Sequence, residues 1–191
     1  MFRYALVVLF LAAPAYAQFF SAGVKAGASL TDALSATEFG NVPYDRHYII
    51  GPTVEMHFPF HLSFEVDALY RRNGFDFSTV TLEGSFFSHT ALNDWQFPFL
   101  AKYELWSGLI RPFVDAGIAF RHVSQVGTFG QLSNPNGVGF TAGGGLTLKL
   151  LLLRISPEIR YTHWAQPPYD SIHSGIRSTA NQADFLVGLT F

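Results

Sequence analysis

The chain has 191 residues, with 12 Lys or Arg and 14 Asp or Glu, so its formal net charge at pH 7 is −2. A charge this close to zero gives no basis for a nucleic-acid partner or an acidic one, and the absence of cysteine excludes a fold held by disulfides. Twenty Phe, eight Tyr and seventeen Gly, with 14% charged residues, favour a sheet rich in aromatic side chains and tight turns.

The first 17 residues are typical of a secretory signal peptide. Arg3 precedes the apolar run of residues 4–13, and Ala15-Tyr16-Ala17 provides an Ala-x-Ala cleavage site. This run is too short to span a membrane as a helix, which takes about 20 apolar residues. We therefore expect residues 1–17 to be a cleavable signal peptide and residues 18–191 to form one domain of an exported protein.

Segments of alternating polarity follow, and a period of two predicts β-strands. We expect eight strands, at residues 19–30, 47–58, 62–72, 94–105, 111–123, 138–149, 154–164 and 184–191. Most are about as long as the 9–11 residues with which a tilted strand crosses a bilayer. Short links at 58–61, 105–109 and 150–153 alternate with long links at 31–46, 73–93, 124–137 and 165–182. This sorting predicts an up-and-down barrel with short turns at one end and long loops at the other.

Two prolines lie inside predicted strands, Pro52 and Pro98. Proline cannot donate to the hydrogen-bond ladder, and a closed barrel has no free edge on which to place it. We expect a bulge or a missing hydrogen bond at each position. If either proline ended a strand, the count of eight would be weakened.

One face of the predicted strands is apolar, whereas the other carries almost all of their charges. The charged face holds Lys25, Glu55, Glu65, Asp67, Arg71, Lys102, Glu104, Asp115, Arg121, Lys149, Glu158, Arg160 and Asp184. Only the apolar face can contact lipid, since an Arg or Lys at the bilayer midplane costs about 2–4 kcal/mol. The charges therefore belong in the lumen, which in an eight-stranded barrel is narrow enough for side chains to fill. Six basic and seven acidic residues favour a network of buried ion pairs over an ion-selective pore, the alternative.

Aromatic residues cluster where the two membrane interfaces would fall, as expected for interfacial anchors. At the short-turn end these are Phe20, Phe58, Tyr103, Trp106 and Phe191. At the long-loop end they are Tyr48, Tyr70, Trp95, Phe120, Phe140, Tyr161 and Trp164.

The final segment alternates Phe185, Val187, Leu189 and Phe191 with more polar or smaller residues. It resembles the C-terminal signature of bacterial outer-membrane β-barrels, in which the last strand closes the barrel and carries the assembly signal. With the strand count and loop asymmetry, the mature chain resembles the small outer-membrane barrels of the outer membrane protein A and X type. The resemblance implies an all-β, eight-stranded antiparallel transmembrane barrel with periplasmic termini and extracellular long loops. It also implies contact with lipid and lipopolysaccharide, recognition by the barrel-assembly machinery and no cofactor.

The resemblance covers structural proteins, adhesins, small pores and enzymes, so it assigns no activity by itself. Residues 160–165 are similar to a segment of lipid A deacylases in which a Ser two residues after a His is the nucleophile. In this chain Ala165 occupies the Ser position, and no Glu follows His163. His122 and Ser124 have the same spacing, but Glu158 is the one downstream Glu and lies beyond a long loop. We therefore expect a non-enzymatic structural or surface-interaction protein, with a pore or a deacylase as the alternatives.

Three further signals are weak. The histidines toward the long-loop end have no metal-ligand spacing, so we expect no metal site; they are His47, His89, His122, His163 and His173. The second long link contains four Phe residues, which would form an adhesive patch, pack on the rim or continue a hairpin beyond the membrane; they are Phe75, Phe77, Phe86 and Phe87. Residues 143–145 are three glycines inside a predicted strand, where they favour curvature or close packing rather than phosphate binding.

Overall fold

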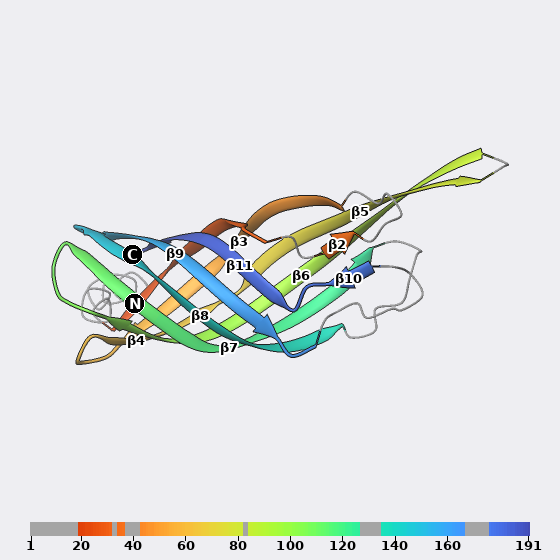
Figure 1. Ribbon diagram of the computed structural model, residues 1–191. Coiled ribbons are helices and arrows are strands. Elements are labelled where there is room, and N and C mark those ends of the chain that lie inside the picture. Colours follow the sequence, from red (N-terminus) through yellow and green to blue (C-terminus); the bar gives the residue numbers. More distant parts are fainter. Residues whose placement is uncertain (1–18, 32–33, 37–42, 82–83, 127–134, 167–175) are drawn as a thin grey trace, which may run out of the picture.

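The computed structural model describes residues 19–31, 34–36, 43–81, 84–126, 135–166 and 176–191 (Figure 1). The predicted signal peptide, residues 1–17, lies outside this range. Within it, the chain consists of antiparallel strands joined by turns and loops. No helix among the described residues is long and apolar enough to cross a membrane.

The strands form a closed up-and-down barrel. In order around it these are β1 (Phe20–Ser29), β3 (Pro43–His57), β4 (Leu62–Asp67) continued by β5 (Leu69–Thr81), β6 (Gly84–Glu104), β7 (Ile110–Val126), β8 (Asn136–Leu150), β9 (Leu153–Trp164) and β11 (Asn181–Thr190). β11 pairs with β1 from Gly23↔Thr190 to Ser29↔Asp184, which leaves no sheet edge in the barrel wall. The predicted all-β, eight-stranded antiparallel barrel is confirmed, as are the three short turns.

β4 and β5 are one strand of the barrel, interrupted at Ala68. The pairs Thr53↔Asp67 and Ile50↔Tyr70 on β3 share one register, so no residue is inserted at the break. By that register Ala68 lies opposite Pro52, and it donates to the Pro52 carbonyl at 3.0 Å, but proline has no N–H to return the bond. Pro98 lies beside the same break on β6. The interruption is therefore a local loss of hydrogen bonds, and the count of eight strands holds.

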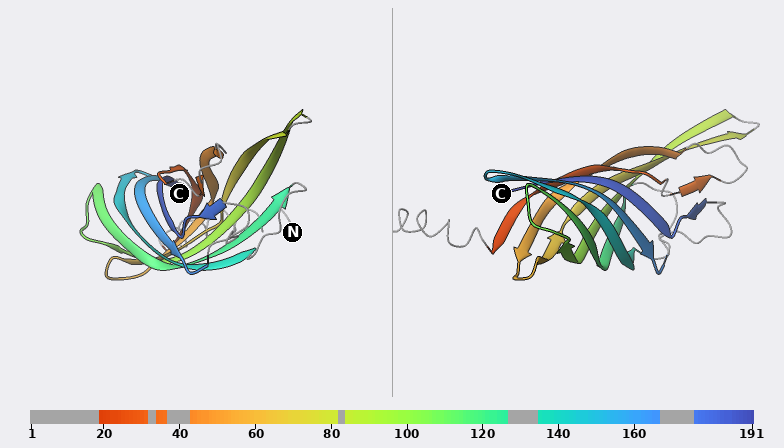
Figure 2. Two further views of the ribbon diagram at one scale, coloured as in Figure 1. Left: turned by 45° about the vertical axis from the view of Figure 1, so that its right-hand side comes forward. Right: turned by 60° about the vertical axis from the view of Figure 1, so that its left-hand side comes forward.

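The second long link is mostly a hairpin and not an irregular loop, one of the arrangements that the sequence suggested for its Phe-rich segment. β5 and β6 pair without a break from Leu69↔Gln96 to Thr81↔Gly84, so a two-stranded hairpin replaces most of residues 73–93. This hairpin projects well beyond the rest of the barrel (Figures 1 and 2). Two short strands, β2 (Leu34–Ala36) and β10 (Ile176–Ser178), pair with each other and join the first long link to the last.

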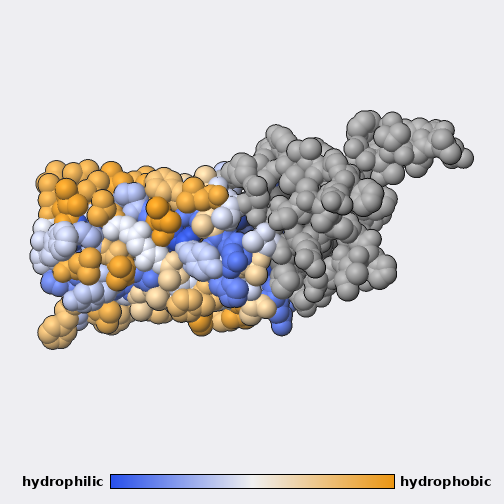
Figure 3. Space-filling view, viewed as in Figure 1, coloured by the Kyte–Doolittle hydropathy of each residue, from blue (hydrophilic) through white to orange (hydrophobic). Residues whose placement is uncertain are grey.

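The outward face of the wall is apolar. Phe, Leu, Ile, Val and Tyr side chains alternate along every long strand with buried residues, and hydrophobic residues cover much of the visible surface away from the loop end (Figure 3). The four residues of the predicted assembly signal lie on this face, with Phe185, Leu189 and Phe191 exposed. A surface this apolar is unsuited to water and suited to lipid.

The lumen face of β8 has little side-chain volume, because Gly137, Gly139, Gly143 and Gly145 alternate along it. Larger lumen side chains of the neighbouring strands fill the space. A Cβ added to Gly143 would lie 2.8 Å from Asp115 Oδ1 and 3.1 Å from Glu158 Oε1. The glycine run thus permits close packing inside the barrel, one of the two roles that the sequence suggested for it.

Candidate functional site

The lumen contains the largest group of functional candidates. Of the thirteen charged residues that alternation assigns to it, all except Lys149 are buried. Lys149 lies near the end of β8, is half-buried and forms no ion pair within the described part of the chain. A buried charge without a partner costs several kcal/mol, so the contacts of the other twelve decide whether the lumen is stable.

Glu65 on β4 is the centre of an ion-pair network. It contacts Lys25 of β1, and its carboxylate lies 3.2 Å from Lys102 of β6 and 2.9 Å from Arg160 of β9. Lys102 also rests over the ring of Phe113, at 4.1 Å from the centroid. Three cations from three strands therefore converge on one carboxylate.

Arg160 forms ion pairs that connect opposite walls of the barrel. Its guanidinium lies 2.7 Å from Asp67 and 2.9 Å from Glu65, both on β4, and 2.5 Å from Glu158 on its own strand. β4 and β9 are four strands apart in either direction around the eight-stranded wall, so these contacts cross the lumen. Lys25 adds a second link between the same carboxylates, at 3.4 Å from Asp67 and 3.0 Å from Glu158.

A second polar layer lies toward the long-loop end. Arg71 pairs with Asp184 at 2.6 Å, and Gln182 bridges Asp184 to Gln96 through its side-chain amide. Gln96 also donates to Asp94 at 2.9 Å. Between this layer and the central network lies a small apolar cluster made of Ile49, Leu69 and Leu186. The described part of the lumen thus contains two groups of polar contacts and a small apolar cluster.

The short-turn mouth has weaker ion pairs. Glu104 pairs with Arg111 at 2.8 Å, and the Arg111 side chain is 25% exposed. His57 lies between Ser21 and Arg154 and approaches Glu55 at 3.7 Å. Arg111 and Phe113 were absent from the predicted lumen set, although their odd numbers on β7 match those of Asp115 and Arg121. Strand parity alone would have found them.

Besides Lys149, two predicted lumen residues, both buried, form no ion pair with any residue that the structure describes. Neither carboxylate oxygen of Asp115 has a hydrogen-bond partner among the described residues. Arg121 forms no ion pair within the same part of the chain; it donates to the Gln166 carbonyl at 3.2 Å and stacks on Trp164 at 4.2 Å. The charges that alternation places inside therefore do not all become ion pairs.

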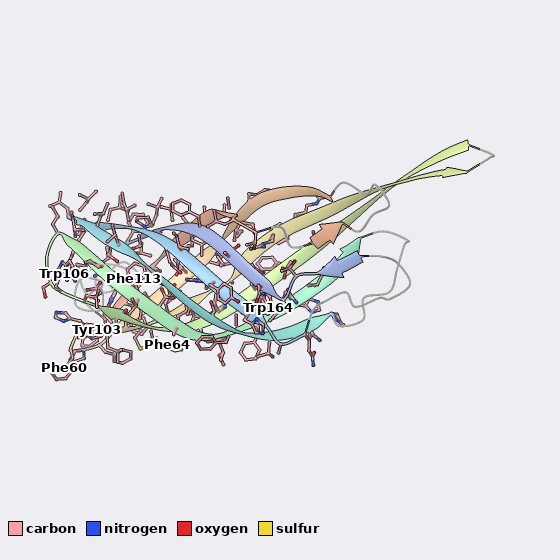
Figure 4. All side chains as sticks on the ribbon, viewed as in Figure 1. Phe60, Phe64, Tyr103, Trp106, Phe113 and Trp164 are labelled. Atoms are coloured by element: carbon pink, nitrogen blue, oxygen red, sulfur yellow. The ribbon has the colours of Figure 1, made fainter. Side chains whose placement is uncertain are left out.

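Trp164 is not an interfacial anchor, so this part of the aromatic prediction is wrong. The side chain is 1% exposed and lies in the lumen half nearest the loops, where its indole N–H donates to Gln182 at 3.0 Å (Figure 4). The reason is parity, because even-numbered residues of β9 face inward. Phe60, Tyr103 and Trp106 lie at the opposite end of the barrel from Trp164 (Figure 4).

The two histidines weighed for deacylase chemistry lie on the outer face, whereas Glu158 is buried in the lumen. His163 Nδ1 contacts the Asn181 side-chain oxygen at 2.7 Å, and His122 Nδ1 contacts that of Asn136 at 2.8 Å. Ala165, exposed beside His163, has no nucleophile. The described residues include no group of three or more His, Cys, Asp or Glu that could hold a metal ion.

An outward apolar wall around a polar lumen, closed by β1 and β11, is the architecture of an outer-membrane barrel. A family model described as outer membrane protein beta-barrel domain matches residues 4–190. The chain belongs to this outer-membrane β-barrel family. Membership assigns the protein to the bacterial outer membrane, with the apolar face in contact with lipid. No curated protein matches the sequence significantly.

Solved structures of this type share the fold at low sequence identity. Neisserial surface protein A aligns with a TM-score of 0.56 at 12% identity, covering 90% of this chain and 95% of that one. OprG of Pseudomonas aeruginosa gives 0.56 at 10% identity, covering 91% and 94%. Outer membrane protein W of E. coli gives 0.51 at 13% identity, covering 91% and 96%. At these identities the likeness concerns the barrel and carries no activity with it.

Proposed function

We propose that the protein is a non-enzymatic outer-membrane barrel with a structural or surface-interaction role, and that charged side chains close its lumen. The observation that carries this proposal is the set of contacts from Arg160 on β9 to Glu65 and Asp67 on β4, which cross the lumen between opposite walls. Lys25 and Lys102 complete the crossing from two further strands. Together with the apolar cluster above them, these side chains leave little room for a water-filled path.

Planar-bilayer conductance tests the closed lumen. The wild-type barrel should give no stable single-channel current at neutral pH. Replacing Glu65 and Arg160 together by Ala removes one charge of each sign from the centre and should raise the current. The matched control replaces Glu104 and Arg111 by Ala, a charge-neutral pair at the mouth, and should leave the membrane as resistive as wild type. A stable wild-type current would contradict the proposal.

A small-solute pore is the second candidate, favoured by an excess of acid in the middle of the lumen. Five carboxylates gather there with three cations, since Asp115 adds to Glu55, Glu65, Asp67 and Glu158. A path along such a lumen would prefer cations. The same bilayer recordings separate the two functions, because a pore would show a reversal potential shifted toward the cation in a salt gradient.

The absence of enzyme activity is part of the proposal. It is supported by the engagement of His163 and His122 with Asn side chains and by Ala165 at the position of a nucleophile. Incubation of the refolded barrel with lipopolysaccharide, followed by mass analysis of lipid A, should reveal no loss of an acyl chain. Deacylation that disappears in His163→Ala would overturn this part.

The proposed export and assembly rest on the residue patterns of two segments, 1–17 and 184–191. Residues 1–17 would direct export, and Phe185, Val187, Leu189 and Phe191 would present the final strand to the barrel-assembly machinery. Deletion of Phe191 should lower the amount of folded barrel in the outer-membrane fraction, whereas Phe191→Tyr, which keeps an aromatic ending, should not. Equal amounts of folded barrel for the two variants would contradict the proposal that Phe191 is part of an assembly signal.

The proposed orientation has both termini in the periplasm and the long loops outside the cell, among the sugars of lipopolysaccharide. It is supported by the sorting of short and long connections to opposite ends. An epitope inserted between residues 127 and 134 should be labelled on intact cells, and one inserted in the turn at residues 58–61 should not. Labelling of the insertion at residues 58–61, but not of the one between residues 127 and 134, would contradict the proposed orientation.

A further inference from the structure

The three short turns of the barrel carry exposed apolar side chains at their tips. In the turn after β3, Phe60 is 91% exposed, and in the turn after β8, Leu151 and Leu152 are 97% and 87% exposed. The turn after β6 has three more exposed apolar residues, Leu105, Trp106 and Leu109. Phe60 and Trp106 lie at the end of the barrel opposite the long loops (Figure 4). Turns that stand in water are ordinarily polar, so an apolar tip on every short turn indicates an apolar environment around them.

The backbone of two of these turns makes the apolar tips more unusual. Phe60, His61 and Leu151 have φ angles of 66°, 63° and 50°, which lie in the left-handed region. Gly, Asn and Asp favour this region, and a bulky side chain there is uncommon. Neither the conformation of the turn nor contact with water therefore favours Phe60 or Leu151. Contact with an apolar partner would offset both costs.

The outer face of the β8–β9 hairpin is polar toward the long loops and apolar all the way to its tip. Near the loops, exposed His163 contacts Asn181, and exposed His122 on β7 contacts Asn136 of β8; we call these four residues the polar boundary. Toward the tip, the outward residues of the hairpin are Leu146, Leu148, Leu150, Leu153 and Ile155. The nearest charges, Lys149 and Arg154, belong to the inward face and pair with each other one step before the tip. The apolar wall thus continues to the turn without a second polar boundary on this hairpin (Figure 3).

The length of this apolar face matches the hydrocarbon layer of the membrane. β9 advances by ten residues from Leu153, beside the tip, to His163 in the polar boundary. At about 3.4 Å per residue and a tilt of about 35–45°, this segment spans roughly 24–28 Å across a bilayer. The apolar band of an outer-membrane barrel is about 25 Å tall. When His163 lies at one surface of the hydrocarbon layer, Leu151 and Leu152 therefore lie at the other.

We propose that the tips of the short turns are inserted into the phospholipid leaflet at their end of the barrel, so that lipid and not water covers Phe60, Trp106, Leu151 and Leu152. The leaflet is continuous with the lipid that already surrounds the outward wall of an outer-membrane barrel. A protein partner would have to contact three separate tips around the mouth, whereas lipid reaches all of them. The inference concerns the depth of the barrel in the membrane. It does not depend on which side of the membrane the short turns face or on whether the lumen conducts.

The depth of a tip is measured with nitroxide labels on the protein in phosphatidylcholine vesicles. The chain has no cysteine, so each label is attached to a single variant: Leu152→Cys at a tip, Ile159→Cys on the lipid-facing wall or Asn136→Cys in the polar boundary. All three side chains are exposed. Oxygen, which concentrates in lipid, and a water-soluble nickel chelate are then compared as relaxing agents. We expect the label at position 152 to behave like the one at position 159, with oxygen more effective than nickel, and the label at position 136 to show the reverse.

Two other results of the labelling experiment would overturn the proposal. If the nickel chelate relaxes the label at position 152 as strongly as the label at position 136, the tip stands in water. If the label at position 152 is protected from both oxygen and nickel, the tip contacts protein, and a second copy of this chain covers it in place of lipid.

The left-handed turn residues give a second test, in which water and lipid predict opposite signs. Leu151→Asn introduces a residue that favours the left-handed conformation, so it would stabilise a turn that stands in water. In the leaflet, loss of the apolar side chain outweighs this gain, and the unfolding constant from urea titration in vesicles should rise several-fold. His61→Asn is the matched control, because His61 is also left-handed but already polar; it should lower the unfolding constant or leave it unchanged. An unfolding constant for Leu151→Asn at or below that of wild type would overturn the insertion of this tip.

Discussion

Arg160→Gln should destabilise the barrel by about 3–5 kcal/mol, the cost of removing one partner from a buried ion pair. The wild-type guanidinium is almost completely buried and reaches three carboxylates at 2.5–2.9 Å. Glutamine is neutral and has two amide donors in place of five. Glu65 would keep Lys25 and Lys102, and Asp67 and Glu158 would keep Lys25 alone. The substitution therefore removes ion pairs chiefly from Asp67 and Glu158, which have fewer remaining partners than Glu65.

The measurement is reversible urea unfolding of the refolded protein in lipid vesicles, followed by tryptophan fluorescence. Arg111→Gln is the matched control, because its pair with Glu104 lies at the partly exposed mouth and should be worth less than about 1 kcal/mol. Adding Asp67→Asn to Arg160→Gln should recover part of the loss, with a coupling energy of about 0.5–3 kcal/mol. If Arg160→Gln and Arg111→Gln differ by less than about 1 kcal/mol, the lumen network is not what holds the walls together.

Two further changes test the packing and the seam. Gly143→Leu should destabilise the barrel by about 1–3 kcal/mol, because its Cβ alone would lie 2.8 Å from Asp115 Oδ1. Gly188→Ala is the control: a Cβ there would be 3.5 Å from the nearest atom, so stability should change by less than about 0.5 kcal/mol in the same unfolding assay. Ala26→Cys with Val187→Cys should form a disulfide visible as a mobility shift on non-reducing gels, since the two residues are directly paired across β1 and β11. Ala26→Cys with Leu189→Cys is two residues out of register and should stay reduced; equal cross-linking of both pairs would argue against the observed register.

Alternation along each strand was enough to predict the barrel and to separate its two faces. Residues 62–67 show why: Leu62, Phe64 and Val66 face outward, and Ser63, Glu65 and Asp67 are buried. The period of two arises from the backbone geometry of a strand, so it does not depend on which side chains fill the lumen. Where parity was not applied, as at Trp164 and Phe113, the expected face was wrong or missing.

The contacts inside the lumen were beyond the reach of the sequence. Lys25 and Glu158 are 133 residues apart, and nothing local to either residue indicates the other. Which cation reaches which carboxylate depends on how far each strand is shifted against its neighbours, a property of the closed wall. The absence of a direct ion pair at Arg121 among the described residues has the same origin. Likewise, residues 73–93 lack a clean period, and their pairing follows from the hairpin that β5 and β6 have already begun.

The projecting hairpin has a mechanical consequence. β3 pairs with β5 only as far as Phe75, and β7 pairs with β6 only as far as Ala91, so beyond these points the described ribbon is two strands wide. From Phe75 to Thr81 it extends about 20 Å, at about 3.4 Å per residue. A ribbon of two strands is marginal on its own, and among the described residues no third strand pairs with either of its edges beyond these points. A third strand that paired with either edge would therefore stabilise the projecting part of the hairpin.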